Sequence, residues 1–148
     1  RRVVVADPRL VLPDAPDRHA GILANARSIL GRADLAYLFG SDSRAEVPIL
    51  ARGTRNREPI TIAGRIDRLV VTPQKVTIVD FKSDATVPAS AALVPAAYAT
   101  QVGLYARLAH QLYPGTEIEA GILWTSLENL MILPDSQIRE AVAAFTIG

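Results

Sequence analysis

The apolar residues of this chain change their spacing near residue 44. Before that point, residues 15–31 (APDRHAGILANARSILG) carry apolar side chains at helical intervals and end at a glycine, which predicts a helix. ADLAYLF predicts a short second helix. Beyond it, RAEVPILARG, PITIAGRIDRLVV and VTIVDFK have the pattern of strands, and the turn TPQK joins the last two.

The rest of the chain uses the two patterns in turn. Residues 95–113 predict a helix that begins at a proline and ends before Pro114-Gly115. EIEAGILWT and NLMILP predict a second hairpin, and DSQIREAVAAF predicts a closing helix. This order of elements predicts an α/β fold in which helices flank a central mixed sheet of about five strands.

Composition narrows the class of protein. The 148 residues are 49% hydrophobic and 21% charged, which is typical of one globular domain. No stretch approaches the ~20 apolar residues of a membrane helix, and the absence of cysteine excludes disulfides and thiolate metal sites. We therefore expect a cytoplasmic protein with no membrane partner. Because the chain begins Arg-Arg-Val without a methionine, we expect it to be a fragment of a longer protein.

Charged residues stand in the predicted hairpin where apolar ones would be expected. If TPQK closes symmetrically, Val71 faces Val76, and the same register sets Asp67 opposite Asp80. The two-residue period of a strand then puts Lys82 on the face of Asp80. The net charge is only +1, and Lys82 is one of just two lysines among 16 basic residues. Two carboxylates and one ammonium are thus predicted to converge at one end of the hairpin.

Such a trio suits metal-assisted hydrolysis. Paired carboxylates that face each other repel unless a cation lies between them, and Mg²⁺ prefers a few carboxylates together with water and substrate phosphate. A nearby lysine can orient or deprotonate the attacking water. The alternative is that Asp67 pairs with Arg65 or Arg68 on the hairpin surface and that Lys82 is a solvated strand end.

The motifs resemble a known family. GRID (64–67) followed by VDFK (79–82) is similar to the signature of the PD-(D/E)XK nucleases, and QVGLY (101–105) resembles the Gln-x-x-x-Tyr motif of their RecB-like branch. The flanking SRAEVPI and GILWT resemble the C-terminal nuclease domain of AddA-type helicase–nucleases. The resemblance implies a restriction-endonuclease-like core. Residues 1–148 would form a single nuclease domain, with a helical N-terminal part (1–43) and a nuclease core (44–148).

The resemblance also implies roles for the metal-binding end. Asp67, Asp80 and the backbone carbonyl of Phe81 would bind Mg²⁺, with Mn²⁺ as a possible substitute. Lys82 would serve the attacking water. Glu46 would have a supporting role beside the metal ligands, although an exposed glutamate on a surface strand is the alternative.

Gln101 and Tyr105 lie one helical turn apart. The resemblance implies that they line the site and contact the DNA backbone or steady the lysine, and a plain core aromatic is the alternative for Tyr105. Arg52 and Arg65, on the first hairpin, would hold DNA phosphates. Arg55 and Arg57 belong to the same basic group, for which a solvated hairpin tip is the alternative.

The implied activity is exonuclease-type cleavage of DNA single strands during double-strand-break repair. The partners would be DNA, the helicase portion of the parent chain and an AddB-like subunit. Relatives carry a metal-ligating histidine on an N-terminal helix, and neither His19 nor His110 matches its context. A catalytically incomplete DNA-binding or scaffolding domain of the same fold is therefore an alternative. An unrelated α/β module with a chance motif is another.

Overall fold

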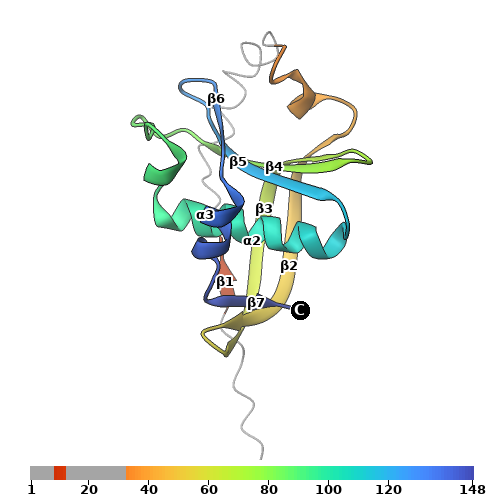
Figure 1. The fold of residues 1–148 in the computed structure, drawn as a ribbon, viewed down its shortest axis with the longest axis vertical. Helices are drawn as coiled ribbons and strands as arrows, with labels where there is room; N and C mark the ends of the chain where they lie inside the picture. Colours follow the sequence, from red (N-terminus) through yellow and green to blue (C-terminus); the bar gives the residue numbers. More distant parts are fainter. Residues whose placement is uncertain (1–8, 13–32) are drawn as a thin grey trace, which may run out of the picture.

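The computed structural model describes residues 9–12 and 33–148. The strands are β1 (Arg9–Val11), β2 (Ser43–Arg55), β3 (Glu58–Val71), β4 (Lys75–Lys82), β5 (Glu117–Trp124), β6 (Asn129–Ile132) and β7 (Phe145–Ile147). The helices are the 3-10 helices η1 (Ala36–Phe39) and η2 (Ala91–Leu93) and the α-helices α2 (Ala96–Leu112) and α3 (Asp135–Ala141). Figure 1 shows α2 crossing in front of the long strands β2 and β3.

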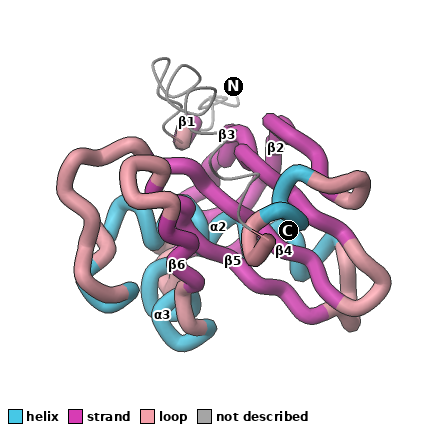
Figure 2. Tube along the Cα trace, turned by 90° about the horizontal axis from the view of Figure 1, so that it is seen from above, coloured by secondary structure: helices cyan, strands magenta, loops and turns pink. Residues whose placement is uncertain are grey.

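Within the described ranges, the strands form one mixed sheet of seven. Its order is β6-β5-β4-β3-β2-β7, and β1 pairs with β3 beside this path. β4 and β5 are parallel, as are β1 and β3, while the other neighbours are antiparallel. A parallel neighbour requires a crossover, and α2 supplies it between β4 and β5. Figure 2 shows β1 beside β3, on the side of the molecule away from β6 and α3.

The β2–β3 hairpin is the longest element of the sheet. Its two-residue turn, Asn56-Arg57, has φ angles of 49° and 69°, which match the right-handed twist of the strands that it joins. β7 pairs with β2 along the edge of β2 that does not pair with β3. This close approach requires a residue without a side chain at Gly53. A side chain at Gly53 would collide with the carbonyl of Thr146.

The two faces of the sheet bury separate apolar groups. The larger group packs beneath α2 and includes Val76, Ile78 and Ile122. On the opposite face, Val79 and Phe81 pack with the segment around η1. Alternate residues of β4 therefore face different layers, as the period of a strand requires.

Several elements differ from their predictions. α3 ends at Ala141 rather than at residue 145, because Phe145 is drawn into β7 and pairs with Arg55 of β2. Residues 9–11, within the part predicted as helical, form strand β1, and the short second helix is the 3-10 helix η1. The helix predicted over 15–31 lies outside the described residues. None of the described helices is both long and apolar enough to span a membrane.

Candidate active site

Asp67 lies where β3 changes its neighbour. The predicted register is confirmed from Val71, which pairs with Val76, to Arg68, which pairs with Val79. Toward its N-terminus, β3 instead pairs with β1 over residues 61–63. Residues 64–67, which we call the fork, span the interval between these two neighbours. In the described part of the chain, no strand pairs with the fork on this side.

The carboxylate of Asp67 connects the fork to β4. Its Oδ2 accepts a hydrogen bond of 2.7 Å from the backbone N–H of Phe81. Asp67 is 4% exposed and Asp80 is fully buried, so neither is a surface carboxylate. Asp80 occupies the same alternation of β4 as Val76 and Ile78, the face beneath α2.

Lys82 is enclosed rather than solvated. It is 7% exposed, and its Nζ lies 2.9 Å from Oδ2 of Asp80 and donates a 2.9 Å hydrogen bond to Oε1 of Gln101. The ring centroid of Tyr98 is 4.3 Å from the same nitrogen. The alternative of a solvated strand end is thus wrong for Lys82. Burial of a lysine is costly unless its charge is paired and hydrogen-bonded, and Lys82 is both paired with Asp80 and hydrogen-bonded to Gln101.

Arg68, one of the two arginines considered as surface partners of Asp67, has other partners. Arg68 donates to Oγ of Ser43 and stacks its guanidinium over the ring of Phe39, 4.6 Å from the centroid. These partners belong to the η1 side of the sheet. Burial lowers the pKa of Arg68, and the charge of Glu46 opposes this effect.

Tyr105 holds the backbone of the fork. Its hydroxyl donates to the carbonyl of Arg65 at 2.9 Å and accepts from the N–H of the same residue at 3.1 Å. Nε2 of Gln101 lies 3.5 Å from this hydroxyl, at the limit of a hydrogen bond. Burial raises the pKa of Tyr105, the hydrogen bonds with Gln101 and Arg65 oppose this effect, and the charges of Asp80 and Asp67 add to it. Through Lys82 and Gln101, the carboxylate of Asp80 is thus linked to Tyr105 on α2.

Tyr98 was missed by reasoning from the sequence. It precedes Gln101 by three residues on α2, a spacing that places both on one helix face and could have revealed it. Its hydroxyl donates a 2.8 Å hydrogen bond to Oδ2 of Asp84, and its ring lies 6.1 Å from that of Trp124. The hydrogen bond to Asp84 is the main reason why the pKa of Tyr98 is raised, and burial adds to it.

The other predicted site residues lie outside this buried group. Glu46 is exposed on β2 with a φ of 52°, across from Asp67 between the pairs that Ala45 and Val47 make with β3. A left-handed φ in a non-glycine residue is a strained conformation that often occurs near functional sites. Arg52 and Arg65 are exposed on the β2–β3 part of the sheet.

The remaining basic and histidine residues stand further out. Arg55 and Arg57 are exposed at the hairpin tip, and the guanidinium of Arg55 lies over the ring of Phe145 at 5.5 Å. His110 is exposed in the last turn of α2. His19 lies outside the described residues.

The donor atoms fit a hard divalent cation. Asp67 and Asp80 offer carboxylate oxygens within one buried, polar group, and Mg²⁺ is commonly held by one or two carboxylates plus water. Among the described residues, no group of three or more His, Cys, Asp and Glu side chains could hold a metal ion. The described donor set is therefore a two-carboxylate set.

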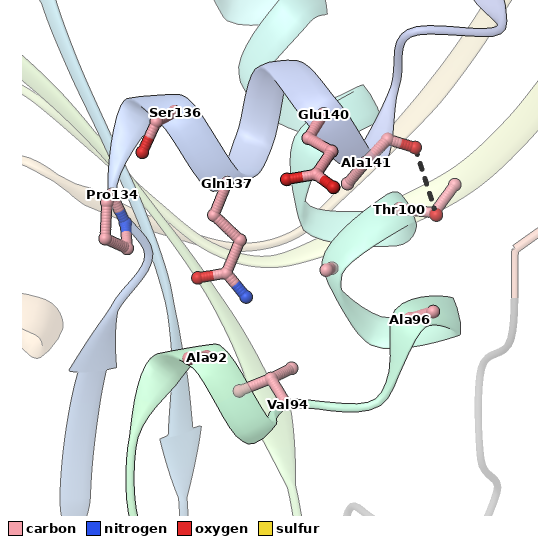
Figure 3. Close-up of a pocket in the computed structure, with 10 residues that line it drawn as sticks. Ala92, Val94, Ala96, Thr100, Pro134, Ser136, Gln137, Glu140 and Ala141 are labelled. Carbon is pink, nitrogen blue, oxygen red and sulfur yellow. Dashed lines mark hydrogen bonds between the residues drawn. The ribbon is translucent and has the colours of Figure 1, made fainter.

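A hollow in the described part of the protein lies away from this group. It measures about 660 Å³ and lies between α3, the start of α2 and η2 (Figure 3). Its polar side chains serve the fold: Thr100 donates to the carbonyl of Ala141, and Gln137 donates to that of Ala91. Small apolar residues such as Ala92 and Val94 form much of its wall. These two hydrogen bonds tie α3 to α2 and to η2.

Comparison with known proteins identifies the family. The model of the PD-(D/E)XK nuclease superfamily matches residues 8–144. One similar solved structure is described as "Crystal structure of SSO0001", with a TM-score of 0.47 and 13% identity over 95% of this chain and 76% of that chain. No curated protein matches the chain. Because the family match covers almost the whole chain, including both strands and the helix that form the site, this protein belongs to the PD-(D/E)XK nuclease superfamily.

Proposed function

We propose that this chain is a Mg²⁺-dependent deoxyribonuclease module, with Mn²⁺ as a possible substitute. The observation that carries the proposal is the buried contact between Asp80, Lys82 and Gln101 at the fork where Asp67 bonds to β4. Two carboxylates, a fixed ammonium and a family whose members are nucleases all favour phosphodiester hydrolysis.

Each residue has a distinct task in this proposal. Asp67, Asp80 and the carbonyl of Phe81 would hold the cation, which when bound lowers the pKa of water and offsets the charge on the phosphate. Lys82 directs its ammonium at the attacking water and at the negative charge that grows on the phosphate. Gln101 fixes the ammonium through its Oε1 atom, and Asp80 supplies the opposite charge.

The reaction is a hydrolysis. The oxygen of water bonds to phosphorus and one ester P–O bond breaks, while the proton lost by the water ends on the released alkoxide oxygen. The products are a phosphate monoester and a free hydroxyl. Arg52 and Arg65, which are exposed along β2 and β3, would hold neighbouring phosphates without reading bases.

The finer assignment extends the same proposal. The Gln-x-x-x-Tyr spacing of Gln101 and Tyr105 supports the RecB-like branch, and the flanking sequences support an AddA-type module. In this setting residues 1–148 form one nuclease domain of a cytoplasmic helicase–nuclease, with 44–148 as its core. The module would degrade single strands exonucleolytically during double-strand-break repair, beside the helicase portion and an AddB-like subunit.

A second candidate is a catalytically incomplete DNA-binding or scaffolding domain of the same fold. The sequence favours it, because neither His19 nor His110 stands in the context of the metal-ligating histidine that relatives carry on an N-terminal helix. Glu46, across from Asp67, would in the first candidate support the cation from β2.

The decisive experiment measures degradation of linear and circular single-stranded DNA with Mg²⁺, using the protein in its natural full length. Asp67→Asn and Asp80→Asn should each lower the rate by a factor of at least ~10². Asp135→Asn, in an exposed aspartate of α3, is the matched control and should cleave like the wild type. Linear strands should be degraded and circular strands spared. Cleavage by Asp80→Asn at the wild-type rate would overturn the proposal.

A second measurement does not depend on activity. Mn²⁺ should raise the melting temperature of the wild type, because a ligand that binds the folded state stabilises it, and should leave Asp80→Asn unchanged. DNA binding that is equal in wild type and Asp80→Asn, with no cleavage by either, would establish the second candidate instead.

A further inference from the structure

Lys82 is held by three groups, of which one has no part in the family motifs. Asp80 supplies charge, Gln101 supplies an acceptor, and the ring of Tyr98 covers the ammonium at 4.3 Å from its centroid. An ammonium within about 6 Å of an aromatic face is attracted by the electrons of the ring. Lysine has a long, flexible side chain, so two polar contacts alone leave its tip free to move about them. The ring restricts that remaining motion.

Tyr98 is itself fixed at both ends. Its hydroxyl donates to Oδ2 of Asp84 at 2.8 Å, and its ring meets the buried ring of Trp124 with an interplanar angle of 45°. Asp84 lies two residues beyond Lys82, on the segment that leaves β4, and Oγ of Ser126 donates to its carbonyl at 3.2 Å. The ring therefore has a set position relative to the strand that carries Lys82.

We propose that Tyr98 is a positioning residue for the nuclease reaction, and that its ring face holds the Lys82 ammonium in line with the attacking water. This inference rests on the proposed function. Its contacts with Lys82, Trp124 and Asp84 occupy the ring and the hydroxyl, so Tyr98 acts through Lys82 rather than by stacking on a DNA base. The ring is the part that matters, and the hydroxyl serves only to orient it.

Kinetics of two substitutions separate the ring from the hydroxyl. Tyr98→Leu removes the ring and should lower kcat about tenfold, or ~1.4 kcal/mol, while KM for DNA stays within about twofold. Tyr98→Phe keeps the ring and should retain kcat within about threefold. Tyr113→Leu, a half-buried tyrosine at the far end of α2, is the matched control and should leave both constants unchanged. Equal losses in Tyr98→Phe and Tyr98→Leu would overturn the proposal, as would full activity in Tyr98→Leu.

A spectroscopic measurement tests the contact without activity. Selective ¹³C labelling of lysine gives ε-CH₂ signals for Lys82 and Lys75, which Lys82→Arg and Lys75→Arg variants assign. Lys75 pairs with Glu119 away from Tyr98 and is the internal reference. The ring current of Tyr98 should move the Lys82 signals upfield of those of Lys75, in the wild type and in Tyr98→Phe alike. In Tyr98→Leu the shift should vanish.

The two proposals fail in different ways. If the Lys82 signals of the wild type coincide with those of Lys75, the positioning role is overturned, and this result needs no folded Tyr98→Leu variant. If the wild type and Asp80→Asn are equally inactive on DNA, the proposed function falls, and the positioning role in catalysis falls with it. If the wild type cleaves and Tyr98→Leu cleaves equally well, only the positioning role falls.

Discussion

The hydroxyl of Tyr105 serves both backbone groups of Arg65, donating to its carbonyl at 2.9 Å and accepting from its N–H at 3.1 Å. In an ordinary sheet a neighbouring strand would make these bonds. Here β3 lies between its pairings with β1 and β4, and among the described residues it is a side chain from α2 that makes these bonds. Tyr105 therefore fixes the backbone two residues before Asp67.

Removing that hydroxyl should weaken the fold measurably. Tyr105→Phe leaves the N–H and the carbonyl of Arg65 without this partner, which should lower the free energy of unfolding by ~1–3 kcal/mol. Denaturant unfolding measures the change, and Tyr113→Phe is the control. A Tyr105→Phe protein as stable as the wild type would contradict the assigned bonds.

The same hydroxyl predicts a pH dependence. The pKa of Tyr105 is raised above the usual value near 10 because burial disfavours the phenolate. A group whose pKa is raised on folding contributes stability below its unfolded pKa and loses it as the pH rises toward the folded value. The stability advantage of wild type over Tyr105→Phe should thus be constant from pH 7 to about 9.5 and shrink above pH 10. Unfolding curves of both proteins across this range measure it, and an advantage that grows above pH 10 would reverse the assigned sign.

Gly64 should be sensitive for the same reason. A Cβ at this position would lie 2.8 Å from the Tyr105 hydroxyl and 3.1 Å from Cβ of Leu12. Gly64→Ala should therefore destabilise the protein by ~1–3 kcal/mol. In a double-mutant cycle with Tyr105→Phe, the double variant should lose less unfolding free energy than the sum of the two single losses. The reason is that both substitutions act on one hydroxyl. Strict additivity would mean that Leu12, not Tyr105, makes the collision.

The register of the β3–β4 hairpin was predictable from the sequence. The residue at which the pairing of the two strands stops was not. A symmetric turn at TPQK sets the pairing from Val71–Val76 to Arg68–Val79, because a short turn fixes the strands that it joins. The sequence of the hairpin contains no information about β1, which pairs with β3 from outside it. The pairing of β3 with β4 stops at Arg68, and residues 61–63 of β3 pair with β1 instead. Reasoning from the hairpin alone therefore placed Asp67 in a regular pair rather than in a hydrogen bond to Phe81.

Two further features depend on residues that are distant in the sequence. They are the burial of Lys82 and the residue at which α3 ends. The sequence left open whether Lys82 is a solvated strand end, and in the structure Gln101 and Tyr98 of the crossover helix cover it. Likewise, AVAAF favours helix locally, but pairing of β7 with β2 stabilises Phe145 as a strand residue. Local propensity is a weak guide where tertiary contacts compete with it.

Charge balance at Asp80 gives a further prediction. Asp80→Ala leaves the Lys82 ammonium buried without its counter-charge and should cost ~3–5 kcal/mol of unfolding free energy. Asp80→Ala/Lys82→Met removes both charges at similar volume and should recover most of that loss, while cleavage of DNA stays absent. Thermal melts and nuclease assays of the two variants separate loss of folding from loss of chemistry. Equal instability of the single and double variants would show that the pair is not the source of the cost.

The crossover through α2 has a consequence for the order in which the chain folds. Asp67 and Phe81 are 14 residues apart and come together when the β3–β4 hairpin closes, whereas Lys82 and Gln101 are 19 apart and Arg65 and Tyr105 are 40 apart. Closing a longer loop costs more chain entropy, so contacts distant in sequence form more slowly. We expect the contact between Asp67 and Phe81 to form early in folding and the contact between Lys82 and Gln101 to form late. Nuclease activity should therefore return after strand protection in pulsed hydrogen exchange, once α2 has docked.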